Sequence, residues 1–396
     1  MSLPLAGIRV ADFSGHASGP LCAMMLGDFG AEVIKIEALT GDKARKWGVA
    51  RFGAKGDLSS EYLALNRNKS SIAINLKNKE GLEVARRIIA SCDVLLENFK
   101  PGVMERLGLD YETISKTNPK LVYCSISAFG QTGPLARRPG FDLLMQAYAG
   151  PLSITGEPDR PAVRIGPSAI DFMTGAHAVI GILAALRERD RSGLGQMVDT
   201  SLYESALVFM THMMVDYTGT NHLPVRWGAY FPFLAPYGIF KAKDREFYIG
   251  ASTDAMWTRL CEAIDRHDLL KDPRFLTNAD RSKNQTELYE IFVPLFKEKN
   301  AHEWTDLATQ LNIPNSLIHD LSEVVQQEQA LSRDAIIPIG GVDKVRSAGI
   351  PIKLSRTPGQ VRKAPPSLAE DADDILASLG ITEDEAKNLR ASGAIL

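Results

Sequence analysis

Asp171 is the acidic residue whose surroundings most suggest chemistry. It stands alone between an uncharged segment, residues 165–170 (IGPSAI), and an apolar stretch that begins at Phe172. Because the N-terminus of a helix stabilises anions, a carboxylate here is expected to stay ionised at neutral pH. An ionised carboxylate in a partly apolar pocket can attack an activated carbonyl and form a covalent intermediate. The position also suits a simple N-cap, for which Asp is a preferred residue, so both interpretations stand.

Basic residues are concentrated in the first half of the chain, on segments that follow predicted strands. Such side chains could bind the phosphates of a nucleotide-like ligand. Each of them alone is more typical of a solvated surface charge, so only their concentration favours a binding role. They are Lys43, Arg45, Lys46, Arg67, Lys69, Lys100, Arg106, Arg137 and Arg138.

Several common catalytic and nucleotide-binding motifs are absent. There is no GxxxxGK[ST] loop for ATP, no GxGxxG after the first predicted strand and no GxSxG of a serine hydrolase. The 7 histidines show no HExxH pattern, and the 4 cysteines lack the pair spacing of a disulfide framework or a zinc site. We therefore expect no metal site and no use of ATP.

The elements that must position these residues alternate between strands and helices over the first 130 positions. This rhythm predicts a doubly wound parallel sheet, whose ligand binds at the carboxyl edge of the strands. Asp171 then opens a long helix that continues to about residue 189. The predicted strands cover residues 8–13, 31–37, 71–76, 92–96 and 121–126, and the predicted helices cover residues 20–30 and 79–91.

The chain is predicted to form two domains of α/β character. A length of 396 residues is typical of two domains. After residue 226, short strands and short amphipathic helices replace the longer elements. We predict a doubly wound parallel-sheet large domain over residues 1–220, to which residues 335–396 return, and a smaller α+β domain over residues 226–330.

Composition limits the partners and the location of the protein. The 45 basic and 48 acidic residues give a net charge of −3, without the basic excess of a nucleic-acid-binding protein. The most apolar run, residues 178–186, is shorter than a membrane-spanning helix needs, and the N-terminus lacks the features of a signal peptide. We expect a cytoplasmic protein with neither nucleic acid nor a membrane as a partner.

A series of segments carries a resemblance to a known family. They are LAGIRVADFSGHASGP (5–20), GDKARKWG (41–48), LNRNKSSIAINLK (65–77), ENFKPGVMERLGLDY (97–111), SISAFGQTGP (125–134), GLGQMVDTSLYES (193–205) and IPIKLSRTP (350–358). In this order they resemble the class III CoA-transferases, the formyl-CoA and carnitine CoA-transferase group. The resemblance covers nearly the whole chain and depends on the order of the segments more than on any one of them.

This resemblance implies a reaction and a catalytic residue. It implies that Asp171 attacks an acyl-CoA donor to form a mixed anhydride, and that the CoA thiolate then forms an aspartyl-CoA thioester from which an acceptor acid takes CoA. Acyl-CoA and a small carboxylic acid are then the substrates, and no tightly bound cofactor is needed. The resemblance also implies a homodimer of two interlocked rings.

The resemblance also implies positions for the CoA contacts. It places the pantetheine arm near His16 and Ala17, and the phosphates near Arg106. It places Asp142 at an acidic position close to the reacting centre. The complete predicted CoA-binding set is His16, Ala17, Asn68, Lys69, Ile72, Asn98, Phe99 and Arg106.

Departures from the family pattern indicate the substrate. The glycine run of the formyl-CoA branch is replaced by WGAYFPFLAPYG at residues 227–238, which makes oxalate and formate less expected. Ala17 and Ala38 stand where the family often has glutamine and arginine. The APYG element resembles branches that use C4 and C5 dicarboxylates, so succinyl-CoA is the expected donor. Arg226 or His16 could bind the distal carboxylate.

Three other functions compete with CoA transfer. An α-methylacyl-CoA racemase needs a paired histidine and aspartate, but Gly140-Phe141-Asp142 carries phenylalanine at the histidine position. A non-catalytic CoA-binding protein would use Asp171 only as a cap. A dinucleotide-dependent oxidoreductase fits the strand–helix rhythm, although the missing GxGxxG argues against it.

Overall fold

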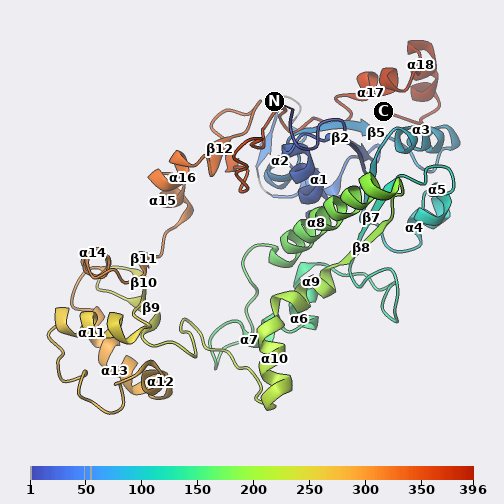
Figure 1. Ribbon diagram of the computed structural model, residues 1–396. Helices are drawn as coiled ribbons and strands as arrows, with labels where there is room; N and C mark the ends of the chain where they lie inside the picture. Colours follow the sequence, from blue (N-terminus) through green and yellow to red (C-terminus); the bar gives the residue numbers. More distant parts are fainter. Residues whose placement is uncertain (1, 49, 54–55) are drawn as a thin grey trace. The chain divides into compact units, whose positions relative to one another are not determined.

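The computed structural model describes residues 2–48, 50–53 and 56–396, and the chain divides into two compact units (Figure 1). The larger unit contains residues 1–151, 165–215 and 328–396, and the smaller contains residues 152–164 and 216–327. The prediction had assigned residues 152–164 to the large domain. They join the smaller unit because the Gly228 amide donates to the Gly156 carbonyl at 3.1 Å and the Arg226 guanidinium donates to the Arg160 carbonyl.

A six-stranded parallel sheet forms the centre of the larger unit. Its strands lie in the order β5-β2-β1-β6-β7-β8, which is 3-2-1-4-5-6 when they are counted along the chain. This is a doubly wound topology, as predicted, and its order reverses between β1 and β6. The strands are β1 (Arg9–Asp12), β2 (Glu32–Glu37), β5 (Lys69–Ala73), β6 (Val94–Glu97), β7 (Val122–Ser127) and β8 (Met197–Ser201).

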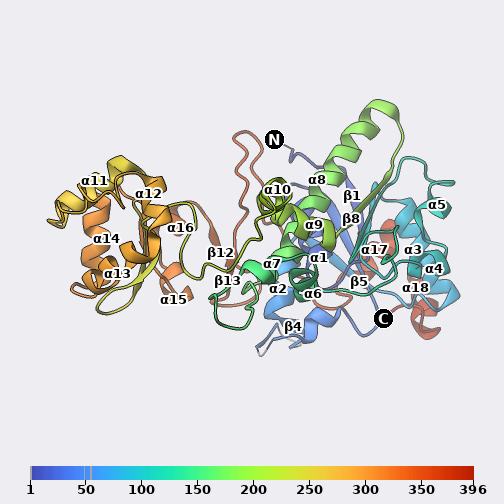
Figure 2. The same cartoon turned by 90° about the horizontal axis from the view of Figure 1, so that it is seen from below.

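The two faces of this sheet are covered by different helices because successive strand residues point to opposite sides. Val10, Val33 and Val94 pack against α1 (Ser18–Asp28) and α8 (Ala169–Ser192). Their neighbours in the strands pack against α3 (Lys79–Ala90), α17 (Ala372–Ser378) and α18 (Glu383–Ala391). Figure 2 shows the second group of helices on the other side of the sheet from α8. The return of the C-terminal residues to the larger unit thus completes one of its two cores.

Shorter elements connect and flank this sheet. Antiparallel pairs are formed by β3 (Arg51–Phe52) with β4 (Leu58–Ser59), and by β12 (Ile336–Pro338) with β13 (Arg346–Ala348). The remaining elements are η1 (Lys43–Lys46), α2 (Ser60–Leu65), α4 (Val103–Leu107), α5 (Tyr111–Ile114), α6 (Asp142–Tyr148), α7 (Pro151–Ile154), α9 (Leu202–Phe209), α10 (Thr211–Thr220) and α16 (Glu328–Ser332).

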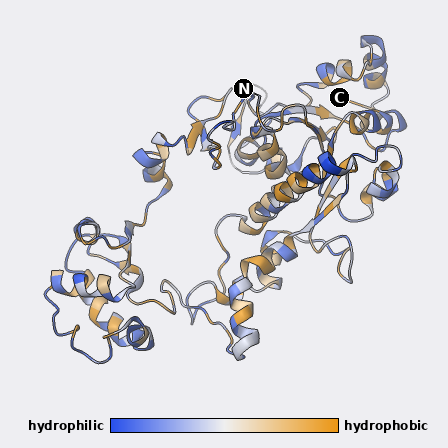
Figure 3. Cartoon of the chain, viewed as in Figure 1, coloured by the Kyte–Doolittle hydropathy of each residue, from blue (hydrophilic) through white to orange (hydrophobic). Residues whose placement is uncertain are grey.

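Helix α8 is the longest described helix and carries Asp171 in its first turn. Figure 3 shows it hydrophobic over most of its length, with hydrophilic residues at its C-terminal end. By length and composition alone it could cross a membrane; one side of it, which includes Ala178, Val179 and Ile182, packs against α1 and the sheet. Gly193, with a φ of 78°, ends the helix in the left-handed conformation that glycine adopts at little cost.

The smaller unit has the α+β character that was predicted. An antiparallel sheet, in the order β11-β10-β9, packs against helices through an aromatic core that includes Phe240, Phe247, Phe292 and Phe296. Its elements are β9 (Tyr237–Lys241), β10 (Glu246–Gly250), α11 (Asp254–Ala263), α12 (Asn278–Lys283), α13 (Gln285–Phe296), α14 (Ala301–Gln310), β11 (Asn315–Leu317) and α15 (Leu321–Val324).

Candidate active site

A cavity of about 560 Å³ lies at the carboxyl edge of the parallel sheet. It is lined by residues that follow β1, β2, β5 and β6, and therefore lies on both sides of the point where the strand order reverses. Ligands of doubly wound sheets bind at this kind of position. The lining residues fall in the ranges 13–16, 35–43, 74–77 and 98–99.

Asn98 joins the two loops that flank the reversal point. Its side-chain amide donates to the Gly15 carbonyl at 2.8 Å, and its Oδ1 accepts from the Gly15 amide at 2.9 Å. The next residue, Phe99, is held by its backbone amide, which donates to Glu97 Oε2 at 2.8 Å. Burial raises the pKa of Glu97 to about 7, against the hydrogen bonds from Ser125 and Phe99 that favour the charged form. The loop after β6 is thus held by Asn98, which bonds the loop after β1, and by Phe99, which bonds Glu97 at the end of β6.

Buried ion pairs hold the residues of β2 and of the segment after it that line the same cavity. Lys35 Nζ lies 3.1 Å from Asp42 Oδ2 and donates to the Ser14 carbonyl at 2.8 Å. Arg45 Nε lies 2.8 Å from Glu37 Oε2. Arg45 also donates to the Tyr62 hydroxyl, so this arginine is engaged inside the protein and is not directed at a ligand.

Three of the predicted CoA-binding residues line the cavity: His16, Asn98 and Phe99. His16 has a φ of 68°, which is uncommon for a residue other than glycine. Its ring centroid lies 4.9 Å from that of Trp47 and 5.8 Å from that of Phe141. Burial lowers the pKa of His16, although Asp42 opposes this, and the ring is expected to be neutral at pH 7.

The other predicted CoA-binding residues do not line the cavity. Lys69 is fully buried, with Nζ 3.1 Å from Asp12 Oδ2, and Asn68 donates to Asp28 Oδ1 at 2.8 Å. Ile72 belongs to the core between the sheet and α3. Ala17 stands at the N-cap position of α1, and Arg106 is exposed on α4. Their assignment to CoA binding stays a prediction, and for Asn68, Lys69 and Ile72 these internal contacts argue against it.

Sequence reasoning missed two exposed lysines that line the cavity, Lys43 and Lys77. Lys43 was noted only as one of many basic residues. Lys77 follows β5, which ends at Ala73, three residues before the predicted end of that strand. Lys69 and Ile72 were assigned from the family resemblance, and both lie within β5, whereas Ile74 and Lys77 follow its carboxyl end and line the cavity.

Asp171 is the third residue of α8 and is not its N-cap. Ser168 holds the N-cap position without a side-chain cap. The first helical amides are satisfied by Asp142 instead, whose Oδ2 accepts from the Ile170 amide at 2.8 Å and from the Asp171 amide at 3.2 Å. Gln146 donates to the other oxygen of Asp142. Asp142 thus caps the helix, and the Asp171 carboxyl accepts no hydrogen bond from any described residue.

The pKa of Asp171 is raised to about 7, first by burial and second by the charge of Asp142. The expectation that this group is fully ionised at neutral pH is therefore wrong. The physical reason is that Asp142 accepts from the helix amides that were expected to stabilise Asp171. A carboxyl with a raised pKa is a more basic, and hence stronger, nucleophile once it ionises.

Contacts within the larger unit connect the Asp171 region to the cavity. Phe141, whose ring contacts His16, directly precedes Asp142. One turn after Asp171, Gly175 packs so closely on α1 that a Cβ at this position would lie 2.6 Å from the Ser18 carbonyl oxygen. The start of α8 and the loop that contains His16 are thus held together by two separate contacts.

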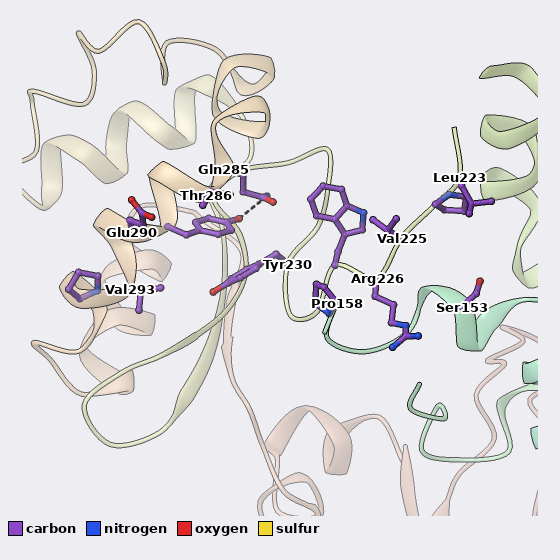
Figure 4. A pocket seen from close by; sticks show the side chains of 14 residues that line it. Ser153, Pro158, Leu223, Val225, Arg226, Tyr230, Gln285, Thr286, Glu290 and Val293 are labelled. Atoms are coloured by element: carbon purple, nitrogen blue, oxygen red, sulfur yellow. Dashed lines mark hydrogen bonds between the residues drawn. The ribbon is translucent and has the colours of Figure 1, made fainter. Parts of the chain in front are cut away.

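The smaller unit has its own cavity of about 1150 Å³, lined by residues of the segment 223–230 and of α13 (Figure 4). The predicted substrate residue Arg226 lies here. Its guanidinium donates to the Arg160 carbonyl within the same unit. Gln285 donates to the Tyr289 hydroxyl at 3.1 Å, shown as a dashed line in Figure 4. The lining is mainly apolar and aromatic.

The described residues contain no group of three or more His, Cys, Asp or Glu side chains that could hold a metal ion. What the larger unit does contain is a cavity at a strand-order reversal, two exposed lysines that line it, and a partly buried carboxyl at the start of α8 to which no described residue donates a hydrogen bond. Such a site suits an extended anionic ligand whose reactive end meets the carboxyl.

Comparison with known proteins gives a consistent result. The sequence matches the family described as CoA-transferase family III over residues 5–372. It is 36% identical over 397 residues to a succinyl-CoA–D-citramalate CoA-transferase of Chloroflexus aurantiacus, covering 99% of this chain and 98% of that protein. It is 34% identical over 396 residues to the succinyl-CoA:glutarate CoA-transferase of Mus musculus, covering 99% and 90%.

A solved structure shares the fold. A CAIB/BAIF family protein from Brucella suis has a TM-score of 0.88 and 33% sequence identity, and the match covers 96% of this chain and all of that one. The fold and the sequence thus indicate the same group of proteins.

Proposed function

This chain belongs to CoA-transferase family III, and from that membership we propose that it transfers CoA from succinyl-CoA to a C4–C5 dicarboxylic acid through a covalent intermediate on Asp171. The observation that carries the proposal is the Asp171 carboxyl, which is partly buried in the first turn of α8 and accepts no hydrogen bond from a described residue. Both named relatives use succinyl-CoA and a dicarboxylic acid.

The proposed reaction begins with Asp171 as the nucleophile. An oxygen of its ionised carboxylate attacks the thioester carbonyl carbon, and the C–O bond forms as the carbonyl π electrons move onto oxygen. The tetrahedral species collapses, the C–S bond breaks, and CoA leaves as a thiolate with the bonding pair. The products of this step are a mixed anhydride on Asp171 and free CoA thiolate.

The second half-reaction conserves the energy of the thioester. The thiolate attacks the aspartyl carbonyl of the anhydride, the donor acid leaves as a carboxylate, and Asp171 carries CoA as a thioester. The acceptor carboxylate then repeats both steps in reverse and departs as a new acyl-CoA. Water must be kept from the anhydride, which agrees with the burial of Asp171.

The sheet-edge cavity is the proposed site for CoA. Lys43 and Lys77 stand at its lining with exposed side chains and are the proposed partners of the phosphates. Phe99 and Asn98 lie where the pantetheine arm would enter between the loops after β1 and β6. The arm would then lead past His16 toward Asp171.

A product assay with a substrate panel tests the proposed function. Succinyl-CoA is incubated with mesaconate, itaconate, malate, citramalate, glutarate, oxalate or formate, and the CoA thioesters and free succinate are separated by chromatography. We expect a new C4–C5 dicarboxyl-CoA in equal amount to released succinate, and none with Asp171→Asn. Release of free CoA without a new thioester would contradict CoA transfer and indicate hydrolysis.

The proposed functional state is an interlocked homodimer. The larger unit exposes several large apolar side chains on α8, α9 and α10, among them Ile180 at 64%, Val208 at 55% and Val215 at 65% exposure. Extended apolar surface on a soluble chain commonly marks an interface, and a second copy of the chain would cover it.

One observation favours an α-methylacyl-CoA racemase as a second candidate. The sequence lacks a histidine at position 141, but the His16 ring contacts Phe141, the residue that precedes Asp142. A histidine ring beside this segment is a group that proton transfer at an α-carbon could use. Incorporation of deuterium from solvent at the α-carbon of a 2-methylacyl-CoA would support this alternative, and its absence would exclude it.

A further inference from the structure

His16 is held in a conformation that carries a cost. Its φ of 68° lies in the left-handed region, where a residue other than glycine is disfavoured by about 1 kcal/mol or more. Neighbouring contacts maintain it: the His16 amide donates to Asp42 Oδ1 at 3.4 Å, and Gly15 is bonded on both sides by Asn98. Glycine would adopt this backbone conformation at lower cost, so the presence of a histidine side chain at this position suggests that the imidazole has a function.

One nitrogen of the His16 ring, Nδ1, is buried and makes no hydrogen bond to a described residue. Nδ1 is buried and finds no hydrogen-bond partner among the described residues, while the ring is placed between Trp47 and Phe141. A protonated Nδ1 there would be a buried donor without an acceptor, which is costly. The favoured neutral tautomer therefore carries its proton on Nε2.

The other edge of the ring faces the ligand. His16 lines the sheet-edge cavity, and because Nδ1 is buried without a partner among the described residues, Nε2 is the ring nitrogen left to meet a ligand there. Through Phe141 and Asp142 the same residue adjoins the start of α8. The His16 ring is thus linked, through Phe141 and Asp142, to the turn that carries Asp171.

We propose that Nε2–H of neutral His16 donates a hydrogen bond to the thioester carbonyl oxygen of the donor as Asp171 attacks it. The inference rests on the proposed function and adds a catalytic residue to it. During attack the carbonyl π pair moves onto this oxygen, and a hydrogen bond to the developing negative charge stabilises it more than it stabilises the ground state. On collapse the pair returns to the carbon and the thiolate leaves, so His16 keeps its proton throughout.

This role differs from binding the distal carboxylate of a dicarboxylic acid. An ion pair with a carboxylate would need a cationic ring, whereas burial lowers the pKa of His16 and favours the neutral ring. A neutral donor aimed at a carbonyl acts on every acyl-CoA donor alike. It should therefore govern the rate of acylation and not the choice of acid.

Replacement by asparagine and by glutamine separates this role from a structural one. The amide nitrogen of glutamine can occupy the position of Nε2, and that of asparagine the position of Nδ1. Asparagine tolerates the left-handed backbone better than glutamine does. If His16 has only a structural role, His16→Asn should be more stable and acylated faster than His16→Gln. If His16 has the proposed role, His16→Gln should be acylated faster than His16→Asn.

The test is rapid-quench mass spectrometry of Asp171 acylation by succinyl-CoA in wild type, His16→Gln, His16→Asn and His16→Leu. Thermal unfolding and the calorimetric Kd of CoA are measured alongside. We expect acylation to fall about 100-fold in His16→Leu and His16→Asn and no more than about 10-fold in His16→Gln. The Kd of CoA should change less than about threefold, and the unfolding temperature of His16→Asn should equal or exceed that of His16→Gln.

Two results would overturn the inference while the proposed function stands. The first is acylation of His16→Leu at the wild-type rate, and the second is an acylation rate for His16→Asn equal to or above that of His16→Gln. Wild-type protein that binds CoA but is acylated by no donor would overturn the proposed function, and this inference with it.

Discussion

At the scale of the residue, the reactivity of Asp171 is set by Asp142. The amides at the start of α8 donate to Asp142, so the helix that carries Asp171 does not stabilise its charge through hydrogen bonds. Burial and the neighbouring carboxylate then raise the pKa of Asp171 to about 7. The same raised pKa that makes the ionised carboxylate a stronger nucleophile means that its ionisation destabilises the folded chain.

Replacing Asp171 with asparagine should therefore stabilise the fold at high pH. The folded pKa of about 7 lies above the value of 3.8 for a free group, so the wild type loses stability as pH rises between these values and no further above them. We expect Asp171→Asn to gain on the order of 2 kcal/mol at pH 8 and much less at pH 5. Chemical denaturation at both pH values measures this.

Asp306→Asn provides the matched control, since Asp306 is exposed in the middle of α14. Its unfolding free energy should follow that of the wild type at both pH values. Subtracting the wild type also removes the contribution of Glu97, which titrates in the same range. An Asp171→Asn variant that is less stable than wild type at pH 8 would show that the carboxylate supports the fold.

The sequence singled out Asp171 and Asp142 as candidate site residues but did not indicate their effect on each other. Motif order singled out both positions. Their contact joins residues 29 positions apart, across an irregular segment whose path has no periodic pattern to predict it. Because the pKa of a carboxyl depends on burial and nearby charge, the ionisation state could not follow from the local sequence alone.

At the scale of the element, the site depends on two loops and one helix crossing. The loops after β1 and β6 are joined by Asn98, which bonds both backbone groups of Gly15. Helix α8 crosses α1 at Gly175, one turn beyond Asp171. Each contact can be removed separately, and the two should affect different steps of the reaction.

Asn98→Ala should weaken CoA binding more than catalysis. The substitution removes both hydrogen bonds to Gly15, so the loops on either side of the cavity lose their connection. We expect the KM for acyl-CoA and the Kd of CoA to rise about 10-fold, with kcat changed less than about threefold. Asn388→Ala, an exposed position on α18, should leave both constants unchanged. A fall in kcat as large as the rise in KM would contradict a role of Asn98 limited to positioning the loops.

Gly175→Ala should move the start of α8. The new Cβ would lie 2.6 Å from the Ser18 carbonyl oxygen and press on Leu21, so α1 and α8 must separate. We expect a loss of about 1–3 kcal/mol of unfolding free energy and a fall in kcat. Thermal unfolding and initial rates measure both effects.

Gly219→Ala is the control for this substitution. Gly219 lies in α10, and no described atom is within 4 Å of a Cβ placed there. Alanine should be neutral or stabilise the helix by about 0.5–1 kcal/mol. If Gly175→Ala behaves in the same way, the close crossing of α1 and α8 does not position Asp171.

Periodicity predicted the parallel sheet and its helices because alternation of apolar residues reflects burial directly. It was less successful at the strand ends that define a site. The third strand was expected at residues 71–76 and spans Lys69–Ala73. Lys69 and Ile72 were assigned to the ligand from the family resemblance, whereas the exposed Lys77, beyond the end of this strand, lines the cavity. The edge strand β8 was missed because its sequence, MVDTS, has no clear apolar alternation and its one partner, β7, is distant in sequence.

At the scale of the whole molecule, the chain is organised as two units that the sequence crosses four times. The change to short strands and short amphipathic helices after residue 226 indicated the smaller unit. Nothing in the composition of residues 152–164 indicated that they belong to it, since their hydrogen bonds to the smaller unit join them to residues more than 60 positions away, Arg226 and Gly228. Oligomeric state is likewise a property of surfaces that a single sequence does not reveal.

The exposed apolar side chains of the larger unit predict a dimer that a single charge disrupts. We expect the wild type to sediment at twice the chain mass. Ile180→Glu should sediment as a monomer, because it places a carboxylate in the proposed interface. Lys116→Glu, an exposed change elsewhere in the larger unit, should leave the dimer intact. A monomeric wild type would contradict the dimer without affecting the assignment of Asp171.

The central claim is that Asp171 becomes covalently acylated, and intact-protein mass spectrometry tests it most directly. Wild type and Asp171→Ala are incubated with a panel of acyl-CoA esters, then trapped with hydroxylamine and digested to locate the modified residue. We predict an adduct whose mass depends on the donor, located on Asp171 and absent from the variant. A wild type that binds CoA but is labelled by no donor, or a variant labelled to the same extent, would contradict the proposed mechanism.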